Sequence, residues 1–293
     1  MKQVKINFWN WWGFGLREWK AMFYFLDYDF VLSNDPDYIV YSNTAQRVMP
    51  NLRCDAQRIF FMGEIIDVDM SECEWSFGDN YVDDTRHFRM PYYVVRMLYT
   101  GTPLDSLIKT GDIEKKERFC NFVFSNTADG ATRNRFFERI SEYKRIDSAG
   151  SSLNNMGYVL PGRAGTRVGD YIQYPEKHEF LSKYKFSIAF ENNRSDYNPD
   201  SGYTTEKITE PMLAGSIPIY RGNKRVGEEF NTKSFFNYYD FASEEEFIDR
   251  IIEVDKNDDL YEQMLREPWL NDNKLPRHLD MNEIKKQFGR IFG

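Results

Sequence analysis

Cysteine, histidine and long apolar runs are scarce in this chain of 293 residues. The three cysteines show no CxxC spacing and are odd in number, which argues against a disulfide framework and favours a reducing compartment. The three histidines form no HExxH pattern, so a zinc hydrolase of that type is excluded. The N-terminus has no apolar run of about seven residues, and no stretch approaches the roughly 18 apolar residues of a membrane helix. We expect a cytoplasmic protein without an integral membrane segment, and peripheral attachment to the inner membrane face stays open.

Positive charge is also in deficit. The chain has 38 Lys and Arg against 46 Asp and Glu, a formal net charge of −8. Such a chain has no global attraction for nucleic acid or anionic lipid, so we expect no nucleic-acid partner, and any anionic ligand must meet a local basic site. Hydrophobic residues make up 41% and aromatics 17%, which is enough for a core and excludes disorder as the main state.

Short apolar runs alternate with helical patterns, which is typical of α/β architecture with mostly parallel strands. At roughly 150 residues per domain, the length favours two domains. We expect a first domain at 1–105, a polar linker at 106–116 and a second domain at 117–278. A C-terminal helix would occupy 279–293, and its packing back on the first domain stays open.

The periodicity predicts individual elements along both halves. Strands are predicted over 4–8, 38–41, 58–62, 119–124, 186–190 and 217–220. Helices are predicted over 16–26, 91–99, 131–143, 176–183, 205–213, 243–254 and 282–292, with Ser243 and Glu246 forming a capping box.

The densest polar stretch follows a predicted buried strand that ends at Glu191-Asn192. A helix begins near Thr205, with Glu206 and Lys207 in its first turn. The N–H groups of a helix N-terminus favour an anion, and a lysine there costs about a few tenths of a kcal/mol unless an anionic ligand compensates it. Lys207 is therefore a candidate phosphate ligand, and Glu206 a candidate partner of a ribose hydroxyl. A capped surface helix with an exposed Glu-Lys pair is the alternative.

A second basic candidate is Arg133. It follows a small-residue turn, SNTADG at 125–130, after a predicted strand. Open α/β sheets place ligands outside the strand carboxyl ends, and an arginine there can contact phosphate bidentately. Arg135 and Arg139 follow closely, so one of several solvated charges is the alternative.

Several motifs match one known family. The run FEN…YTTEK…GSIPIYRG resembles the donor-site signature of the α-1,3/4-fucosyltransferases, glycosyltransferase family 10, and the resemblance is strongest to the bacterial members. Further matching segments occur in the family's order: NWWG at 10–13, FMGE at 61–64, FRMPYY at 88–93, and SN at 125–126 with RN at 133–134. The matches extend from about residue 4 to 240, which is most of the chain.

The resemblance implies a GT-B fold, in which two Rossmann-like domains face each other across a cleft. It also implies GDP-β-L-fucose as the donor and inversion to an α-linked product. Carried over by position, Glu64 would be the general base, and Arg133 and Lys207 would hold the diphosphate. Glu206 would bind ribose, and Asn192 and Tyr203 would lie near the donor.

These roles agree with the physical chemistry of an inverting transfer. One base is needed opposite the leaving group, and positive charge where the diphosphate becomes negative. Two fixed cations can supply that charge without a metal, so we expect no required cofactor, GDP-fucose as a co-substrate, and at most stimulation by a divalent ion. Because Glu64 follows an apolar strand, we expect it to be partly desolvated, with a raised pKa.

The acceptor is the least determined feature. The resemblance implies the 3-OH of GlcNAc within N-acetyllactosamine, which would give a Lewis-X-type product on a surface glycan of lipopolysaccharide or protein. Trp11, Trp12, Tyr92 and Tyr93 are the candidates for the acceptor walls. The choice between α-1,3 and α-1,4 linkage, another acceptor, and the oligomeric state all stay open.

The chain departs from the family pattern in four places. The segment 193–204 is longer than in relatives, and we expect a mobile loop beside the donor or acceptor. Thr204 stands where a valine is usual, and Ile65 follows Glu64 where relatives have other residues. A heptad-repeat tail with a basic amphipathic end is lacking, so the sequence does not support membrane docking or dimerisation through one.

Three other functions stay open. Asp67-Val68-Asp69, or Asp35-Pro36-Asp37, could hold a divalent metal on a nucleotide-sugar, although short DxD matches are frequent in an acidic chain. The same fold could use another GDP-deoxysugar. A non-enzymatic carbohydrate-binding protein could stack its tryptophans on sugar rings, but it would have no need of Arg133, Glu206 and Lys207 together.

Overall fold

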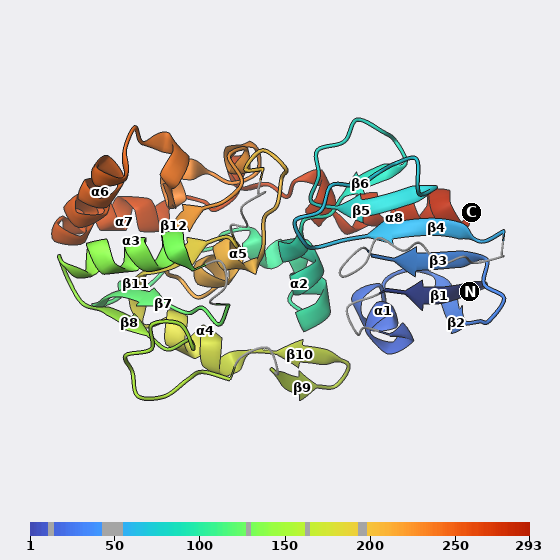
Figure 1. Ribbon diagram of the computed structural model, residues 1–293, viewed down its shortest axis with the longest axis horizontal. Coiled ribbons are helices and arrows are strands. Elements are labelled where there is room, and N and C mark those ends of the chain that lie inside the picture. The colour runs from blue at the N-terminus through green and yellow to red at the C-terminus, as the bar shows by residue number, and fades with distance from the viewer. Residues whose placement is uncertain (11–14, 43–54, 127–129, 162–164, 193–197) are drawn as a thin grey trace.

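The computed structural model describes residues 1–10, 15–42, 55–126, 130–161, 165–192 and 198–293. Two parallel sheets with their helices form two lobes side by side, and α2 (Tyr92–Thr100) lies between them (Figure 1). None of the helices in these ranges is both long and apolar enough to cross a membrane.

The first lobe contains a six-stranded parallel sheet in the order β2-β1-β3-β4-β5-β6. Its strand order reverses between β1 and β3. The strands are β1 (Lys2–Trp9), β2 (Tyr28–Leu32), β3 (Tyr38–Tyr41), β4 (Gln57–Phe61), β5 (Trp75–Gly78) and β6 (His87–Arg89), and α1 (Leu16–Met22) follows β1.

The second lobe contains a five-stranded parallel sheet in the order β13-β12-β11-β7-β8. Its order reverses between β7 and β11. The strands are β7 (Arg118–Phe122), β8 (Ile146–Ser148), β11 (Tyr184–Phe190), β12 (Ile217–Arg221) and β13 (Phe236–Asn237). The helices are α3 (Ala131–Ser141), α4 (Pro175–Leu181), α5 (Glu206–Leu213), α6 (Glu244–Lys256) and α7 (Asp258–Arg266), and an antiparallel hairpin joins β9 (Thr166–Val168) to β10 (Tyr171–Gln173).

Local sequence explains the central elements. The strand β11 reads YKFSIAF and is buried along nearly its whole length, as expected for a parallel strand covered on both faces. The side chain of Ser243 accepts the N–H of Glu246 at the start of α6, and Asn257 and Asp280 cap α7 and the last helix, α8 (Met281–Phe292), in the same way. The helices expected over 131–143, 176–183 and 205–213 appear within one or two residues of these bounds.

Other elements differ from the expectation. The helix predicted over 16–26 ends at Met22, because the chain turns after Phe23, although Phe23 and Leu26 are buried as their spacing indicated. The strands β2, β5 and β6 and the helix α7 were not predicted. These strands are only three to five residues long, and none forms a long apolar run.

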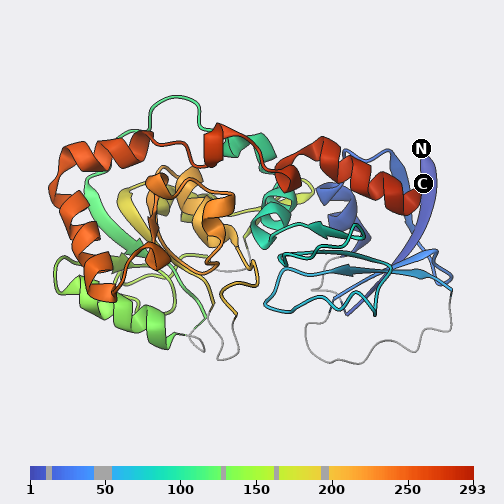
Figure 2. The ribbon, with the colours of Figure 1, turned by 90° about the horizontal axis from the view of Figure 1, so that it is seen from above.

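The C-terminal helix α8 (Met281–Phe292) lies against the first lobe, beside the N-terminus (Figure 2). Phe288 is fully buried, with its ring centroid 4.8 Å from that of Phe23 and 4.9 Å from that of Phe77. The Lys2 ammonium donates to the Phe292 carbonyl at 2.5 Å. The end of the chain therefore completes the core of its first lobe.

The two lobes meet where α2 packs against α5 and the strand-like segment before it. The N–H of Tyr93 donates to the carbonyl of Thr204 at 3.2 Å. One turn further along, Arg96 on α2 pairs with Glu210 on α5 at 3.1 Å, and both side chains are largely buried. This contact sets the carboxyl ends of the two sheets towards one space.

We expect Phe288→Ala to lower the free energy of unfolding by about 3–5 kcal/mol, because it leaves a cavity in the aromatic core of the first lobe. Urea denaturation measures the loss. Lys286→Ala on the same helix is the control, since the Lys286 side chain is 69% exposed and its change should stay within about 0.5 kcal/mol. Equal losses in both variants would contradict the packing of α8.

Candidate active site

A cavity of about 530 Å³ lies between the lobes, at the carboxyl ends of β4, β7 and β11. Open α/β sheets place their ligands at this edge, and β7 and β11 flank the point where the strand order reverses. Residues of both lobes line the cavity: Gly63, Glu64, Tyr92, Arg96 and Tyr99 from the first, and 123–126, Arg133, Gly150, 160–161, Tyr174, Lys177, Asn192, Tyr203 and 205–207 from the second.

Arg133 lies in the first turn of α3 and is only 2% exposed. Its guanidinium donates to the side-chain oxygen of Asn192 and to the carbonyl of Asn126, both at 2.9 Å. The same group lies 4.5 Å from the ring centroid of Phe124. These contacts fix a buried cation at the reversal point of the sheet, and a guanidinium so held is suited to bind phosphate.

Lys207 is largely buried at the N-terminus of α5, with 15% of its side chain exposed. Its ammonium lies 3.4 Å from a carboxylate oxygen of Glu191 and donates to the Thr205 hydroxyl at 3.1 Å. Burial lowers the pKa of Lys207, but Glu206 and Glu191 raise it, and the net direction is upward. The Lys207 ammonium is therefore charged at neutral pH. The alternative that the sequence left open, a surface helix with an exposed Glu-Lys pair, is wrong.

Glu191 holds the start of α5 in place. Its carboxylate accepts the N–H and the hydroxyl of Thr205, each at 2.7 Å. Burial raises the pKa of Glu191, and the nearby Lys207 opposes that rise. The sequence placed Glu191 at a strand end without a role, and the structure makes it the support of the helix N-terminus that carries Glu206 and Lys207.

Glu206 faces three cations. Burial alone would raise its pKa, but Lys207, Arg96 and Lys177 lower it to about 2. The carboxylate is therefore ionised throughout the physiological range and can only accept hydrogen bonds there. An acceptor held this way suits a diol such as the two hydroxyls of a ribose.

Arg96 and Lys177 were not recognised from the sequence. Arg96 lies 3.7 Å from the ring centroid of Tyr174, and Lys177 pairs with Glu210 at 2.5 Å. Arg96 follows Tyr92 by four residues on the same helix, so both side chains lie on one helix face. This spacing could have identified Arg96 from the sequence. Lys177 offered no such signal, because it belongs to a separate helix that tertiary packing brings to the cavity.

Glu64 lies just beyond the end of β4, on the first-lobe wall of the cavity. Tyr92 and Tyr203 line the same cavity, and their pKa values are raised mainly by burial, with a smaller contribution from the negative charge of Glu64. Glu64 itself is exposed in this structure, which does not show the partial desolvation expected from the sequence. The reason is that the apolar strand stops at Phe61 and the chain leaves the sheet before Glu64.

Of the aromatic candidates that the structure describes, some line the cavity and one does not. Tyr92 lines the cavity, and so does Tyr203, which is only 3% exposed. Tyr93 does not line it, because neighbouring helix positions point about 100° apart. Its fully buried hydroxyl instead contacts His278 Nε2 at 2.6 Å and Glu229 at 3.2 Å. Trp11 and Trp12 lie outside the described residues.

Neither DxD match lines the cavity, and the match at 67–69 makes local contacts instead. Asp67 accepts from the Asn80 side chain at 2.8 Å, and Asp69 accepts from the N–H and the hydroxyl of Ser71. Within the ranges that the structure describes, no group of three or more His, Cys, Asp and Glu side chains is placed to hold a metal ion.

Family models match both lobes. Residues 6–98 match the Alpha-(1,3)-fucosyltransferase FucT N-terminal domain, and residues 113–289, more than half of the chain, match Glycosyltransferase family 10 (fucosyltransferase) C-term. The chain belongs to glycosyltransferase family 10. The family expected from the sequence is thereby confirmed.

Relatives of known name or structure agree. The Alpha-(1,3)-fucosyltransferase FucT of Helicobacter pylori is 28% identical over 92% of this chain, and the chain spans about 60% of that protein's length. A crystal structure of an alpha1,3-fucosyltransferase with GDP-fucose is 28% identical, covers 99% of this chain and 91% of its own, and has a TM-score of 0.77. An alpha-glucosyltransferase in complex with UDP-glucose and DNA shares the fold alone, at 12% identity and a TM-score of 0.54. The expected GT-B fold is confirmed.

We expect the stabilising contribution of Glu206 to depend on pH. Its folded-state pKa of about 2 lies below its usual 4.5, so the contribution is fully present above about pH 4.5 and is lost as the pH falls towards 2. The difference in unfolding free energy between the native protein and Glu206→Gln, measured by urea at pH 7 and pH 3, should be smaller at pH 3. A difference that is equal at the two pH values, or larger at pH 3, would contradict the charge pattern around Glu206.

Proposed function

We propose that the chain transfers L-fucose from GDP-β-L-fucose to a glycan hydroxyl, with inversion at the sugar. The observation that carries this is one cavity with a first-lobe carboxylate, Glu64, and two second-lobe cations, the buried Arg133 and the largely buried Lys207. Membership of family 10 and likeness to a structure that holds GDP-fucose support it.

On the donor side, Arg133 and Lys207 hold the diphosphate, and Glu206 accepts from the ribose hydroxyls. Asn192 and Tyr203 lie beside them in the cavity wall. Arg133 and Lys207 are already fixed by protein contacts before a ligand enters, so little reorganisation is needed when charge develops on the leaving GDP. We propose that these cations supply the charge that a divalent metal supplies in other nucleotide-sugar transferases, so a metal is at most stimulatory.

In the transfer itself, the acceptor oxygen attacks the anomeric carbon of fucose while the bond from that carbon to the diphosphate breaks. The acceptor proton goes to the Glu64 carboxylate, and the electron pair of the broken bond stays on GDP. Glu64 is exposed in this structure, so bound sugars would have to supply the enclosure that raises its pKa towards neutrality.

For the acceptor, we propose the 3-OH of GlcNAc in N-acetyllactosamine, which gives a Lewis-X-type product on lipopolysaccharide or protein glycans. Support comes from the names of the relatives and from Tyr92, which lines the cavity on the same lobe as Glu64. Trp11 and Trp12 stay candidates from the sequence, and the cytoplasmic location stays a prediction.

The test is calorimetric titration of GDP and GDP-fucose with EDTA present, followed by addition of N-acetyllactosamine and an assay for GDP release. Binding with acceptor-dependent release is the expected result. If the protein binds another GDP-deoxysugar in place of GDP-fucose, the proposed donor is wrong. If it binds GDP-fucose but releases no GDP when N-acetyllactosamine is added, the proposed acceptor is wrong. A folded protein that binds neither nucleotide would overturn the proposal and favour a carbohydrate-binding protein.

We expect Glu64→Gln to keep its affinity for GDP but to lose transfer by about 10²–10⁴-fold, the usual contribution of a general base. Steady-state turnover and calorimetry measure the two quantities. Glu72→Gln is the matched control, because Glu72 is exposed in the same acidic segment and does not line the cavity. Turnover of Glu64→Gln at the level of this control would exclude Glu64 as the base.

We expect Arg133→Ala to weaken GDP binding about 10- to 100-fold, because a charge-assisted contact contributes about 1.5–3 kcal/mol. Arg135→Ala is the control two residues away, since the Arg135 side chain is 62% exposed and pairs with Glu244 at 2.9 Å. If both variants bind GDP with the same affinity, Arg133 does not hold the diphosphate.

A further inference from the structure

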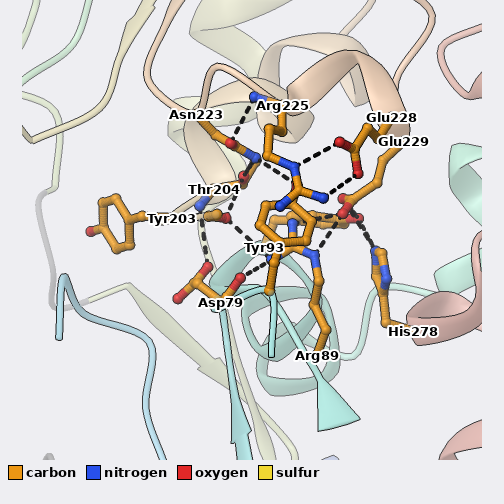
Figure 3. A network of polar contacts seen from close by, with 12 residues as sticks. Asp79, Arg89, Tyr93, Tyr203, Thr204, Asn223, Arg225, Glu228, Glu229 and His278 are labelled. Atoms are coloured by element: carbon orange, nitrogen blue, oxygen red, sulfur yellow. Dashed lines mark hydrogen bonds and ion pairs between the residues drawn. The ribbon is translucent and has the colours of Figure 1, made fainter. Parts of the chain in front are cut away.

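Asp79 lies outside the cavity and contacts residues of both of its walls. It follows β5 in the first lobe and is only 5% exposed. One oxygen of its carboxyl group accepts two backbone N–H groups, from Tyr92 and from Thr204, each at 3.1 Å. Tyr92 begins α2 in the first lobe, and Thr204 precedes α5 in the second lobe. A single atom therefore joins the lobes, and Figure 3 shows Asp79 directed at Thr204.

The residues that Asp79 holds are next to those that line the cavity. Tyr92 itself lines it, on the same wall as Glu64. Thr204 stands between Tyr203 and Thr205, and both of these line the opposite wall. Asp79 does not line the cavity, so it can act on a substrate only through these neighbours.

Every polar group of Thr204 is hydrogen-bonded. It is fully buried, and its carbonyl accepts the N–H of Tyr93 at 3.2 Å. Its hydroxyl donates to the Gly202 carbonyl at 2.9 Å and accepts from the Asn223 side chain at 3.1 Å. The Thr204 hydroxyl thus adds two hydrogen bonds beside the lobe contact, both within the second lobe.

The backbones also approach closely here. The guanidinium of Arg89 donates to the carbonyls of both Asp79 and Gly202, and it pairs with Glu229 at 2.6 Å (Figure 3). Gly202 has a φ of +94°, and a Cβ on it would overlap the carbonyl oxygen of Asp79. A side chain at position 202 would therefore force the two lobes apart at this point.

We propose that Asp79 is a positioning residue for sugar transfer: by accepting from Tyr92 and Thr204 together, it fixes the separation of Glu64 from the donor-binding cations. This inference rests on the proposed function. Reacting atoms must be held about 3–3.5 Å apart, and a misplacement of about 1 Å can cost 10²-fold in rate. GDP affinity should depend much less than kcat on Asp79, because Arg133, Glu206 and Lys207 all belong to the second lobe, where Glu191 holds the start of α5 without Asp79.

The chemistry of the contact suggests a conservative variant. Burial raises the pKa of Asp79 to about 8, so a neutral side chain is tolerated at this position. In Asp79→Asn the amide oxygen can still accept both N–H groups, because the two side chains have nearly the same shape. Asp79→Ala removes the acceptor and leaves both N–H groups buried without their partner.

The experiment measures kcat, GDP affinity and melting temperature for the native enzyme and for four variants: Asp79→Ala, Asp79→Asn, Gly202→Ala and the exposed control Asp83→Ala. We expect Asp79→Ala and Gly202→Ala to lose about 10- to 100-fold in kcat while binding GDP within about threefold of native affinity. Asp79→Asn should keep kcat within about threefold, and Asp83→Ala should match the native enzyme. A merely structural role would not separate kcat from GDP affinity, nor be rescued by asparagine.

The inference is overturned if folded Asp79→Ala keeps its kcat, if Asp79→Asn loses as much as Asp79→Ala, or if kcat and GDP affinity fall together. Should Asp79→Ala fail to fold, Gly202→Ala decides, because it changes the same contact without removing a buried polar group: a selective loss of kcat supports the inference, and a native kcat overturns it. A native enzyme that binds no GDP would instead be the failure of the proposed function, independent of any variant.

Discussion

The contact of α2 with α5 and the residues before it is the constraint on which the rest of the structure depends. Each sheet alone supplies only half of the cavity, since Glu64 belongs to one lobe and Arg133 and Lys207 to the other. The halves become one site because Tyr93 and Thr204 share a backbone hydrogen bond and Arg96 on α2 pairs with Glu210 on α5. The chain strengthens this arrangement by returning at its end to the first lobe, where α8 completes the core.

Buried charge is the second consistent feature. Lys207, Glu191 and Glu206 would each be costly to bury alone, and each is matched by an opposite charge or a hydrogen bond within the same small region. The result is a set of charges that is fixed before any ligand arrives. An enzyme that stabilises negative charge on a leaving group benefits from this, because its cations need no rearrangement during the reaction.

Much of this could be predicted from the sequence, because strand ends and helix starts are local features. Arg133 and Lys207 were found by their places after a strand and at a helix start, and Glu64 and Asn192 by the resemblance to the family; the structure brings all four to one cavity. Lys177 and Asp79 were missed because their roles arise only from the packing of separate elements, whereas Arg96 was missed although its place four residues after Tyr92 on α2 was a local signal. Tyr93 was assigned to the acceptor wall because the motif is contiguous, whereas a helix turns neighbouring side chains in different directions.

The central claim is that one carboxylate acts across the cavity from the diphosphate-binding cations, so that transfer is a single displacement. The most direct measurement is the anomeric configuration of the fucose in the first product made from GDP-β-L-fucose, read by proton NMR before any later reaction. We expect an α-linked fucose, because attack comes from the face opposite the departing GDP. A β-linked fucose as the first product would contradict it, since retention needs a second, nucleophilic group and a covalent intermediate.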